Sequence, residues 1–300
     1  LDVGSNTIHL QVVDGHLGAP PIPNSSHKSI IRLTEYLDES GAITQLGIEK
    51  ITEAILTNLK DAAHLDIDEL LAFATSAIRE ANNGNEIIEK LQKTHEIELQ
   101  ILSGDEEAQL TFLAARRWLG WSSGRLLVLD IGGGSLEMAV GNDESASSTL
   151  SLPIGAGRMT REFLTGDPYT SKSIKALTQF SREQISQSVS GELLLHQADR
   201  IVATSKTFRT LARLTDHWYS DSAKTLEHSA LVAAIEKLKE LNNSQRSNLP
   251  GVSASRAKQL LAGAIVAEAV MSHLKIDEVE ICPWALREGI VLKWLDWMEK

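Results

Sequence analysis

Asp130-Ile131-Gly132-Gly133-Gly134-Ser135, near the middle of the chain, and Asp2-Val3-Gly4-Ser5-Asn6-Thr7, at its start, decide how this sequence folds. In each stretch an acidic residue closes an apolar run. The small residues that follow allow the backbone to turn sharply and bring N–H groups close to a bound anion. A hydrophobic strand is expected after each stretch, over 8–13 and 136–140. Two such loops predict a duplicated α/β fold that holds a phosphate chain from both sides, so we expect a phosphate polymer or a nucleotide as substrate.

The length and composition predict about two domains of ordinary globular type. The chain has 300 residues, of which 42% are hydrophobic and 23% charged, enough for two cores. No apolar run approaches the roughly 20 residues that span a bilayer, and the first 20 residues lack a signal-type pattern. We therefore expect a cytoplasmic protein with no membrane partner. Leu1 falls inside an expected strand, so a few further residues are expected upstream.

The net charge of −11 disfavours nucleic acid as a partner, because non-specific binding of that kind needs a basic surface with many phosphate contacts. A deep site lined by a few basic side chains, backbone N–H groups and a metal ion still binds phosphate strongly. We expect an acidic exterior and a basic cleft. The lone Cys282 cannot form an internal disulfide, and its apolar setting favours a buried core residue over a reactive thiol.

Strands and helices alternate along the whole chain, which favours α/β sheets with helices on both faces. Apolar residues recur at helical spacing over 48–62 after Thr44, a plausible N-cap, and a buried strand is expected over 70–74. The turn-forming segment 116–124 suggests a domain boundary, giving domains 1–118 and 119–300, with the last helix able to pack on the first domain. The proline-rich segment 15–26 is expected to be a surface loop. The other expected strands cover 98–102, 126–130, 149–152 and 200–204, and the other helices 83–93, 104–119, 224–240 and 255–273.

Six motifs, in order along nearly the whole chain, resemble the exopolyphosphatase and guanosine pentaphosphate phosphohydrolase (Ppx/GppA) family. The resemblance is to its short, two-domain members, and it implies two actin-like ATPase (ribonuclease H-like) domains with an interdomain cleft. The family also implies a homodimer. The motifs are 2–7, Ala74-Thr75-Ser76-Ala77-Ile78-Arg79, Leu102-Ser103-Gly104-Asp105-Glu106-Glu107-Ala108, Asp130-Ile131-Gly132-Gly133-Gly134-Ser135-Leu136-Glu137, Gly155-Ala156-Gly157-Arg158, and Ala285-Leu286-Arg287-Glu288-Gly289.

Glu107 is the candidate to hold the attacking water. Hydrolysis of a terminal phosphoanhydride needs a water in line with the leaving oxygen and donors for the charge on the transferred phosphoryl group. The resemblance gives Glu107 the place of the family's catalytic glutamate and Arg79 that of a family arginine. The residues alone favour a simpler role, in which Glu106 and Glu107 complement the N-terminus of a helix. The resemblance reverses this for Glu107 and leaves Glu106 as a solvated neighbour.

Three carboxylates beside the loops, Asp2, Asp130 and Glu137, are the candidate ligands of a metal ion. Hard oxygen ligands in a phosphate site suit Mg²⁺, which needs only one or two protein carboxylates, and Mn²⁺ is an alternative. Each carboxylate could instead satisfy loop N–H groups. The expected phosphate-binding residues of the loops are Gly4, Ser5, Asn6, Gly132, Gly133, Gly134 and Ser135. No zinc-type histidine spacing occurs, and His9 is expected to pack in its strand.

Basic side chains are expected to follow the phosphate chain away from the hydrolysed end. Any one of them could also be a solvated surface charge, and Arg287 could pair with Glu288. Lys206 stands where nucleotide-binding relatives carry glycine at a strand-to-helix turn, so it should favour a phosphate tail over a nucleoside. The candidates are Lys28, Arg32, Arg158, Lys206, Arg209 and Arg287, with Arg256 as a further basic residue.

The sequence therefore predicts an exopolyphosphatase that releases orthophosphate from the ends of inorganic polyphosphate with the help of Mg²⁺. Hydrolysis of guanosine pentaphosphate is the nearest alternative. A kinase of the same superfamily, or a regulator that binds phosphate ligands without turnover, is an alternative of another class. The tryptophans near the boundary and the chain end, such as Trp118 and Trp284, are expected to form a hydrophobic seam or a dimer surface.

Overall fold

The computed structural model describes residues 1–16, 18–95, 97–219 and 222–298, and within them the chain forms two sheets with helices packed against them. One compact unit comprises Leu1–Glu107 with Ile290–Lys300, and the other Ala108–Gly289. The division falls within two helices, earlier than the segment 116–124 suggested, and the end of the chain belongs with the first unit. The expected cleft concerns both units together and stays a prediction.

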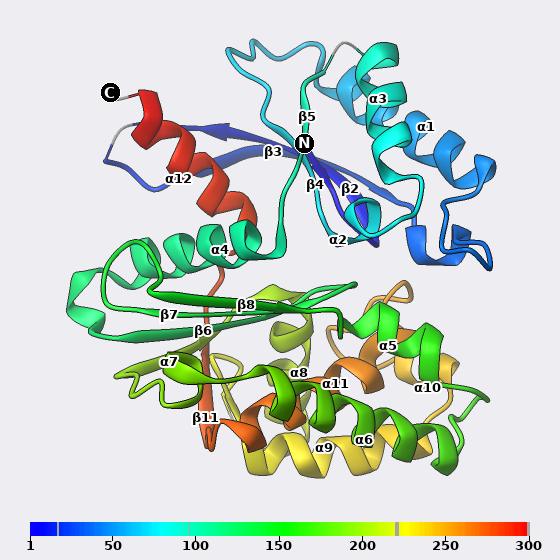
Figure 1. The fold of residues 1–300 in the computed structure, drawn as a ribbon, viewed down its shortest axis with the longest axis vertical. Helices are drawn as coiled ribbons and strands as arrows, with labels where there is room; N and C mark the ends of the chain where they lie inside the picture. The colour runs from blue at the N-terminus through cyan, green and yellow to red at the C-terminus, as the bar shows by residue number, and fades with distance from the viewer. Residues whose placement is uncertain (17, 96, 220–221, 299–300) are drawn as a thin grey trace. The chain divides into compact units, whose positions relative to one another are not determined.

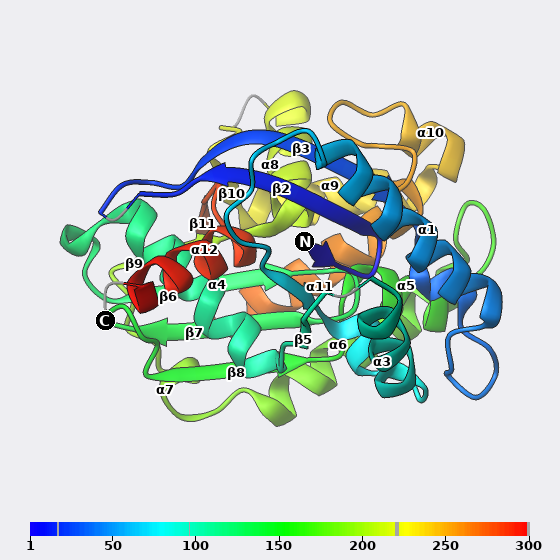
Figure 2. The same ribbon diagram turned by 90° about the horizontal axis from the view of Figure 1, so that it is seen from above.

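The first unit holds a five-stranded sheet of order β3-β2-β1-β4-β5. β1 pairs with β2 in antiparallel and with β4 in parallel orientation, and β4 and β5 are parallel. Figure 2 shows β2 and β3 as a long pair of strands, with α1 packed against both. The elements of this unit are β1 (Asp2–Val3), β2 (Thr7–Asp14), β3 (Ile22–Ile30), η1 (Leu33–Tyr36), α1 (Gln45–Ala62), β4 (Ala72–Ala74), α2 (Ser76–Arg79), α3 (Gly84–His95) and β5 (Leu99–Ile101).

The segment 15–26, expected to be a surface loop, is only partly a loop, because β3 begins at Ile22. β3 is the edge strand of its sheet, where a proline can be accommodated without breaking the ladder. Pro23 pairs with Val13, and the register shifts between Val12 and Val13. The prolines thus mark an irregular edge strand.

The second unit repeats the order of the first sheet and adds one strand. Its six strands run β10-β11-β9-β6-β7-β8. β6 and β7 are antiparallel, as β1 and β2 are, and β9 lies parallel to β6 as β4 lies to β1. The strands are β6 (Leu126–Ile131), β7 (Leu136–Gly141), β8 (Ser148–Leu152), β9 (Arg200–Ala203), β10 (Thr225–Glu227) and β11 (Glu278–Ile281). The duplicated α/β fold predicted from the two loops is confirmed.

Helices cover both faces of the second sheet (Figure 1). Alternate residues of β6 point to different layers, as a pleated strand requires: Leu127 and Leu129 belong to the larger core, and Leu126 and Val128 to a smaller one with α4. The helices are α4 (Gly104–Leu119), η2 (Trp121–Ser123), α5 (Ala156–Phe163), α6 (Ser171–Ser188), α7 (Gly191–Leu194), α8 (Ser205–Tyr219), α9 (His228–Glu240), α10 (Asn243–Ser247), η3 (Ala257–Gln259), α11 (Leu260–His273) and α12 (Leu286–Met298).

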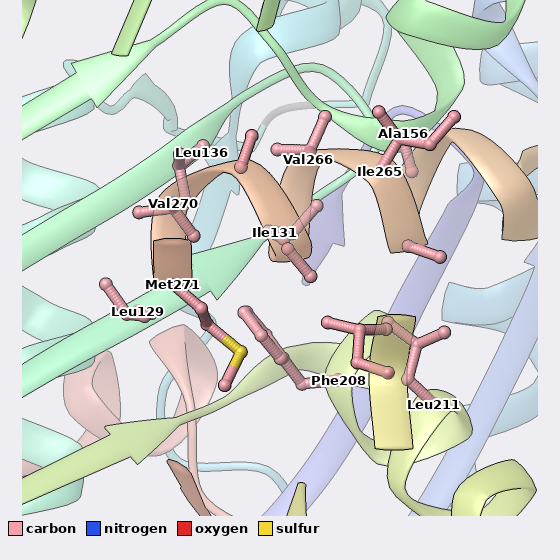
Figure 3. Packing of buried hydrophobic residues seen from close by; sticks show 14 of the residues in the cluster. Leu129, Ile131, Leu136, Ala156, Phe208, Leu211, Ile265, Val266, Val270 and Met271 are labelled. Carbon is pink, nitrogen blue, oxygen red and sulfur yellow. The ribbon is translucent and has the colours of Figure 1, made fainter. Parts of the chain in front are cut away.

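The helix α11 is the centre of the larger core. It is apolar around most of its circumference, as expected for a helix surrounded by protein, and it contacts α5, α6, α8 and α9. Figure 3 shows Met271 of α11 beside Phe208 of α8, Val270 near Leu136 and Ile265 near Ala156. Ile131 of β6 belongs to the same cluster. This packing holds the ends of β6 and the start of α8 in place, and both belong to the candidate site. None of the helices in the described ranges is long and apolar enough to cross a bilayer.

Candidate active site

The first loop, between β1 and β2, is held in shape by the protein itself. The N–H of Gly4 donates to the carbonyl of Thr7 (3.1 Å), and the carbonyl of Ser5 accepts from the N–H of Leu33 (2.8 Å). The side chain of Ser5 is buried, and its Oγ lies 3.3 Å from Oγ of Ser76 at the start of α2. These bonds fix the loop without a ligand, which is the preorganisation that an anion site requires.

Asn6 anchors the first loop to the segment after β3. Its carbonyl accepts from the N–H groups of Ile31 (3.0 Å) and Arg32 (3.1 Å). Arg32 has a left-handed backbone (φ 48°), and its guanidinium approaches Glu35 at 3.5 Å. The predicted substrate residue Arg32 therefore touches the first loop through its backbone.

The second loop, between β6 and β7, has the same closing bond. The N–H of Gly132 donates to the carbonyl of Ser135 (2.9 Å), as that of Gly4 does to Thr7. The start of α5 is hydrogen-bonded to the second loop. Ala156 donates its N–H to the carbonyl of Gly132, and Arg158 donates its N–H to that of Gly133, both at 3.0 Å. The motif that ends in Arg158 is thus part of the loop's support.

The glycines at the start of α5 are needed because no side chain fits between them and the loop. A Cβ on Gly155 would overlap the backbone of Gly134 and Ser135, and one on Gly157 would lie 2.9 Å from the carbonyl oxygen of Gly133. In contrast, none of Gly4, Gly132, Gly133 and Gly134 has a positive φ. The loop glycines therefore do not supply the left-handed turns for which glycine is usually required.

Glu107 and Arg79 form a buried ion pair in the first unit. The carboxylate of Glu107 accepts from Nη1 of Arg79, whose Nη1 also donates to the carbonyl of Leu102 (2.6 Å). The two side chains are only 9% and 20% exposed. Glu107 lies in the first turn of α4, while Arg79 ends α2. The two predicted catalytic residues, 28 positions apart, thus come together.

Glu106 has a different role from its neighbour. Ser103 begins α4, its Oγ accepts from the N–H of Glu106 (3.2 Å), and the carboxylate of Glu106 accepts from the N–H of Ser103 (2.7 Å). This reciprocal pair is a capping box. Glu106 therefore complements the helix N-terminus, whereas the carboxylate of Glu107 pairs with Arg79.

Asp130 and Glu137 lie opposite each other on β6 and β7, so their side chains leave the same face of the sheet. Asp130 accepts from the hydroxyl of Thr204, and Glu137 from that of Ser151 (3.0 Å). Burial raises the pKa of Asp130 to about 6, although the Thr204 bond and the positive charges of Arg209 and Arg256 oppose the rise.

These two carboxylates are ligands of the kind that suits a Mg²⁺ ion. In the ranges that the structure describes, no group of three or more His, Cys, Asp or Glu side chains could hold a metal ion. Mg²⁺ keeps most of its waters and takes one or two carboxylates beside substrate phosphates. Asp130, whose pKa is raised because its carboxylate is poorly solvated, would gain from a nearby dication. Asp2 stands on β1, in the other unit.

The remaining predicted basic residues lie on several elements. Lys28 is exposed on β3, where it pairs in register with His9. Lys206 and Arg209 lie in the first turns of α8, and Arg209 donates Nε to the carbonyl of Ser205 (3.0 Å). Arg287 is near the start of α12.

Sequence reasoning did not single out two hydroxyl residues that shape the second unit's site. Thr204, completely buried, holds the carboxylate of Asp130, and Thr207 donates to the carbonyl of Ile131 beside the second loop (2.8 Å). Both lie in the strand-to-helix segment that also carries Lys206. For Thr204, its place directly after a buried strand was the available signal.

Known proteins match this chain over almost its whole length. The family model described as the Ppx/GppA phosphatase family matches residues 11–298. Exopolyphosphatase 1 of Mycobacterium bovis is 48% identical over 300 residues, which cover 99% of this chain and 87% of that protein. Exopolyphosphatase 1 of Mycobacterium leprae is 46% identical, with 99% and 88% covered.

Solved structures show the same fold. The Aquifex aeolicus PPX-GPPA enzyme has a TM-score of 0.78 and 26% identity, with 97% of each chain covered. An exopolyphosphatase from Cytophaga hutchinsonii has a TM-score of 0.85 at 22% identity, covering 99% of this chain and 96% of that one. Since the match of the family model and the close relatives span almost the whole chain, the protein belongs to the Ppx/GppA phosphatase family.

Proposed function

We propose that this protein is an exopolyphosphatase, which releases orthophosphate from the ends of inorganic polyphosphate. The relatives that are 46–48% identical carry this name. The observation that carries the proposal is the pair of Glu107 and Arg79, because it positions the carboxylate that the proposed reaction uses as a general base.

In the proposed reaction, the carboxylate of Glu107 accepts a proton from a water as the water's oxygen bonds to the terminal phosphorus. The bond from that phosphorus to the bridging oxygen breaks, which leaves orthophosphate and a polyphosphate shorter by one unit. Arg79 holds the carboxylate of Glu107 in position, because the same Nη1 that donates to this carboxylate also donates to the carbonyl of Leu102. Orientation of this kind accounts for a large share of phosphoryl-transfer catalysis.

The two loops would bind phosphate oxygens through their backbone N–H groups, since their shapes are fixed beforehand by the bonds of Gly4 and Gly132. Asp130 and Glu137 would hold Mg²⁺, which neutralises charge on the phosphates when bound. Mn²⁺ could take the same oxygen ligands. A homodimer and a cytoplasmic location remain predictions from the sequence.

Phosphate release by purified wild type and Glu107→Gln, in parallel on short polyphosphate, long polyphosphate and guanosine pentaphosphate, tests the proposal. We expect Glu107→Gln to lose about a hundredfold or more in rate. The matched control is Glu106→Gln, which keeps a capping side chain one residue away and should keep the rate. Equal rates for wild type and Glu107→Gln would remove Glu107 from the mechanism. No release of phosphate by the wild type would refute the function.

Polyphosphate is favoured over guanosine pentaphosphate by the turn between β9 and α8. Lys206 and Arg209 place two cations in the first turns of α8, where they would attract a phosphate tail. Lys206→Gly should weaken binding of polyphosphate and should not weaken binding of a nucleotide. If the affinity for polyphosphate is the same in both proteins at every chain length, this preference is wrong.

A further inference from the structure

The helix α4 covers the face of the second sheet from which Asp130 and Glu137 project. Three side chains of α4 share the smaller core with residues of β6 and β7, and this core includes Ala108, Phe112, Ala115, Leu126, Val128 and Ala139. Every second residue of a strand points to the same face. Asp130 lies two residues after Val128, and Glu137 two residues before Ala139. Both predicted metal ligands therefore leave the sheet on the side that α4 covers.

Gln109 of α4 binds the turn between β7 and β8 through both ends of its amide. Its Nε2 donates to the carbonyl of Ala146, and its Oε1 accepts from the N–H of Ala146, each at 3.0 Å. No other hydrogen bond holds the backbone of Ala146 in the ranges that the structure describes. Ala146 is buried, and buried backbone groups need partners. The amide of Gln109 thus fixes both the position and the orientation of α4 against this turn.

Gln109 is also the part of this contact that lies nearest to Glu107. Among the described side chains of α4 that bind the segment 141–147, Arg116 and Arg117 contact Asp143 and Glu144 from further along the helix. At 1.5 Å per residue, Arg116 is about 14 Å from Glu107 along the axis and Gln109 only about 3 Å. Apolar contacts are not directional, so the core holds α4 against the sheet without fixing where it lies along it. Hydrogen bonds are directional, so Gln109 fixes the first turns.

We propose that Gln109 is a positioning residue for hydrolysis. It fixes the first turns of α4 and thereby the carboxylate of Glu107, whose role as the base that receives the water's proton comes from the proposed function, on which this inference rests. Arg79 holds that carboxylate at its tip, and Gln109 holds the helix that carries it. A displacement of about 1 Å in a catalytic group costs on the order of a hundredfold in rate, so a single amide bridge two residues away matters for turnover.

The test is the release of orthophosphate from short polyphosphate by the intact chain. Gln109→Met keeps the length of the side chain and removes both hydrogen bonds, so kcat should fall about tenfold or more while KM changes by about twofold or less. Arg117→Met is the matched control, because Arg117 contacts Glu144 in the same turn from the far part of α4. It should keep the kcat and the KM of the wild type.

Gln109→Glu tests the bridge itself. A protonated carboxyl group accepts through one oxygen and donates through the other, as the amide does, whereas a carboxylate only accepts. The ratio of kcat in Gln109→Glu to kcat in the wild type should therefore rise about twofold or more as the pH falls from 7 to 5. A merely structural glutamine would change the melting temperature with pH but not this ratio. The acidic side chains of α4 and of the turn are the same in both proteins, and these are Asp105, Glu106, Glu107, Asp143 and Glu144.

Wild-type kcat in a folded Gln109→Met, or an equal loss in Arg117→Met, overturns the positioning role. A higher KM at unchanged kcat also overturns it, because Gln109 would then act on substrate binding. If Gln109→Met does not fold, the ratio for Gln109→Glu decides, and a ratio that is the same at pH 7 and pH 5 overturns the role. A wild type that releases no orthophosphate is a different result, which refutes the proposed function and the role of Gln109 with it.

Discussion

His9 occupies in the first sheet the register position that Glu137 occupies in the second. His9 pairs with Asp2 across β1 and β2, and Glu137 pairs with Asp130 across β6 and β7. A serine on the third strand holds each side chain, since His9 Nε2 lies 2.6 Å from Oγ of Ser26, and Glu137 accepts from Ser151. The duplicated fold therefore keeps the position but places two carboxylates side by side only in the second unit.

The difference between His9 and Glu137 predicts that Mg²⁺ is held by the carboxylates of the second unit. Glu137→Gln removes one of the two hard oxygen ligands, so the Mg²⁺ concentration for half-maximal phosphate release should rise on the order of tenfold or more. His9→Gln changes the equivalent position, where an imidazole is a poor ligand for Mg²⁺, and should leave the Mg²⁺ dependence unchanged. A metal titration of both variants decides this. A shift in His9→Gln that is as large as in Glu137→Gln would contradict the assignment.

Arg116 and Arg117 are neighbours on α4 that contribute very different amounts to stability. Arg116 is 2% exposed and donates to the carbonyls of Asp143, Gly124 and Gly141. Arg116→Met keeps the volume but leaves these carbonyls unsatisfied, so it should lower the free energy of unfolding by about 3 kcal/mol or more.

The control for that prediction is Arg117→Met. Arg117 pairs with Glu144, and both side chains are about a third exposed, 29% and 34%. Such a pair contributes about 1 kcal/mol or less. Urea unfolding followed by circular dichroism measures both variants. Equal losses for the two would show that the buried hydrogen bonds of Arg116 do not hold the second unit together.

Gly155→Ala should displace the second loop. The added methyl group would overlap the backbone of Gly134 and Ser135, so we expect a loss of about 3 kcal/mol or a shifted loop with lower turnover. Gly132→Ala is the matched control, because its Cβ would meet only Ser135 O at an ordinary 3.6 Å. It should leave the unfolding free energy nearly unchanged in the same urea titration. Wild-type stability and turnover in Gly155→Ala would disprove the close contact.

The sequence predicted elements well where several local signals agree. The helix expected over 104–119 matches α4, since Ser103 caps it and its apolar residues recur with helical period. The expected helix 224–240 was wrong at its start, because Thr225–Glu227 pairs with β11 as strand β10. That pairing joins residues more than fifty positions apart, and no local pattern encodes it. The strand β3 was missed in part because its prolines are tolerated only at an edge, and an edge is a property of the sheet.

The sequence was enough to predict which residues belong to the candidate site, but not which of them contact each other. The resemblance distinguished Glu107 from Glu106, but the pairing of Glu107 with Arg79, 28 positions away, is visible only in the fold.

Cys282 was expected to be a buried core residue, and the structure places it in the smaller core with α4, 2% exposed. Burial raises the pKa of its thiol from 9.0 to about 12. Since the thiolate is the reactive form, the folded protein should react with a disulfide reagent at pH 8 at least a hundredfold more slowly than the urea-unfolded chain.

The raised pKa of Cys282 also means that the native state keeps the thiol proton up to a higher pH than the unfolded chain does. Its contribution to stability is complete below pH 9 and is lost as the pH rises from 9 towards 12. Cys282→Ala should remove that part of the alkaline loss of stability, which a pH series of urea titrations measures. An identical alkaline profile in the variant, or rapid labelling of the folded wild type, would show that the thiol titrates normally.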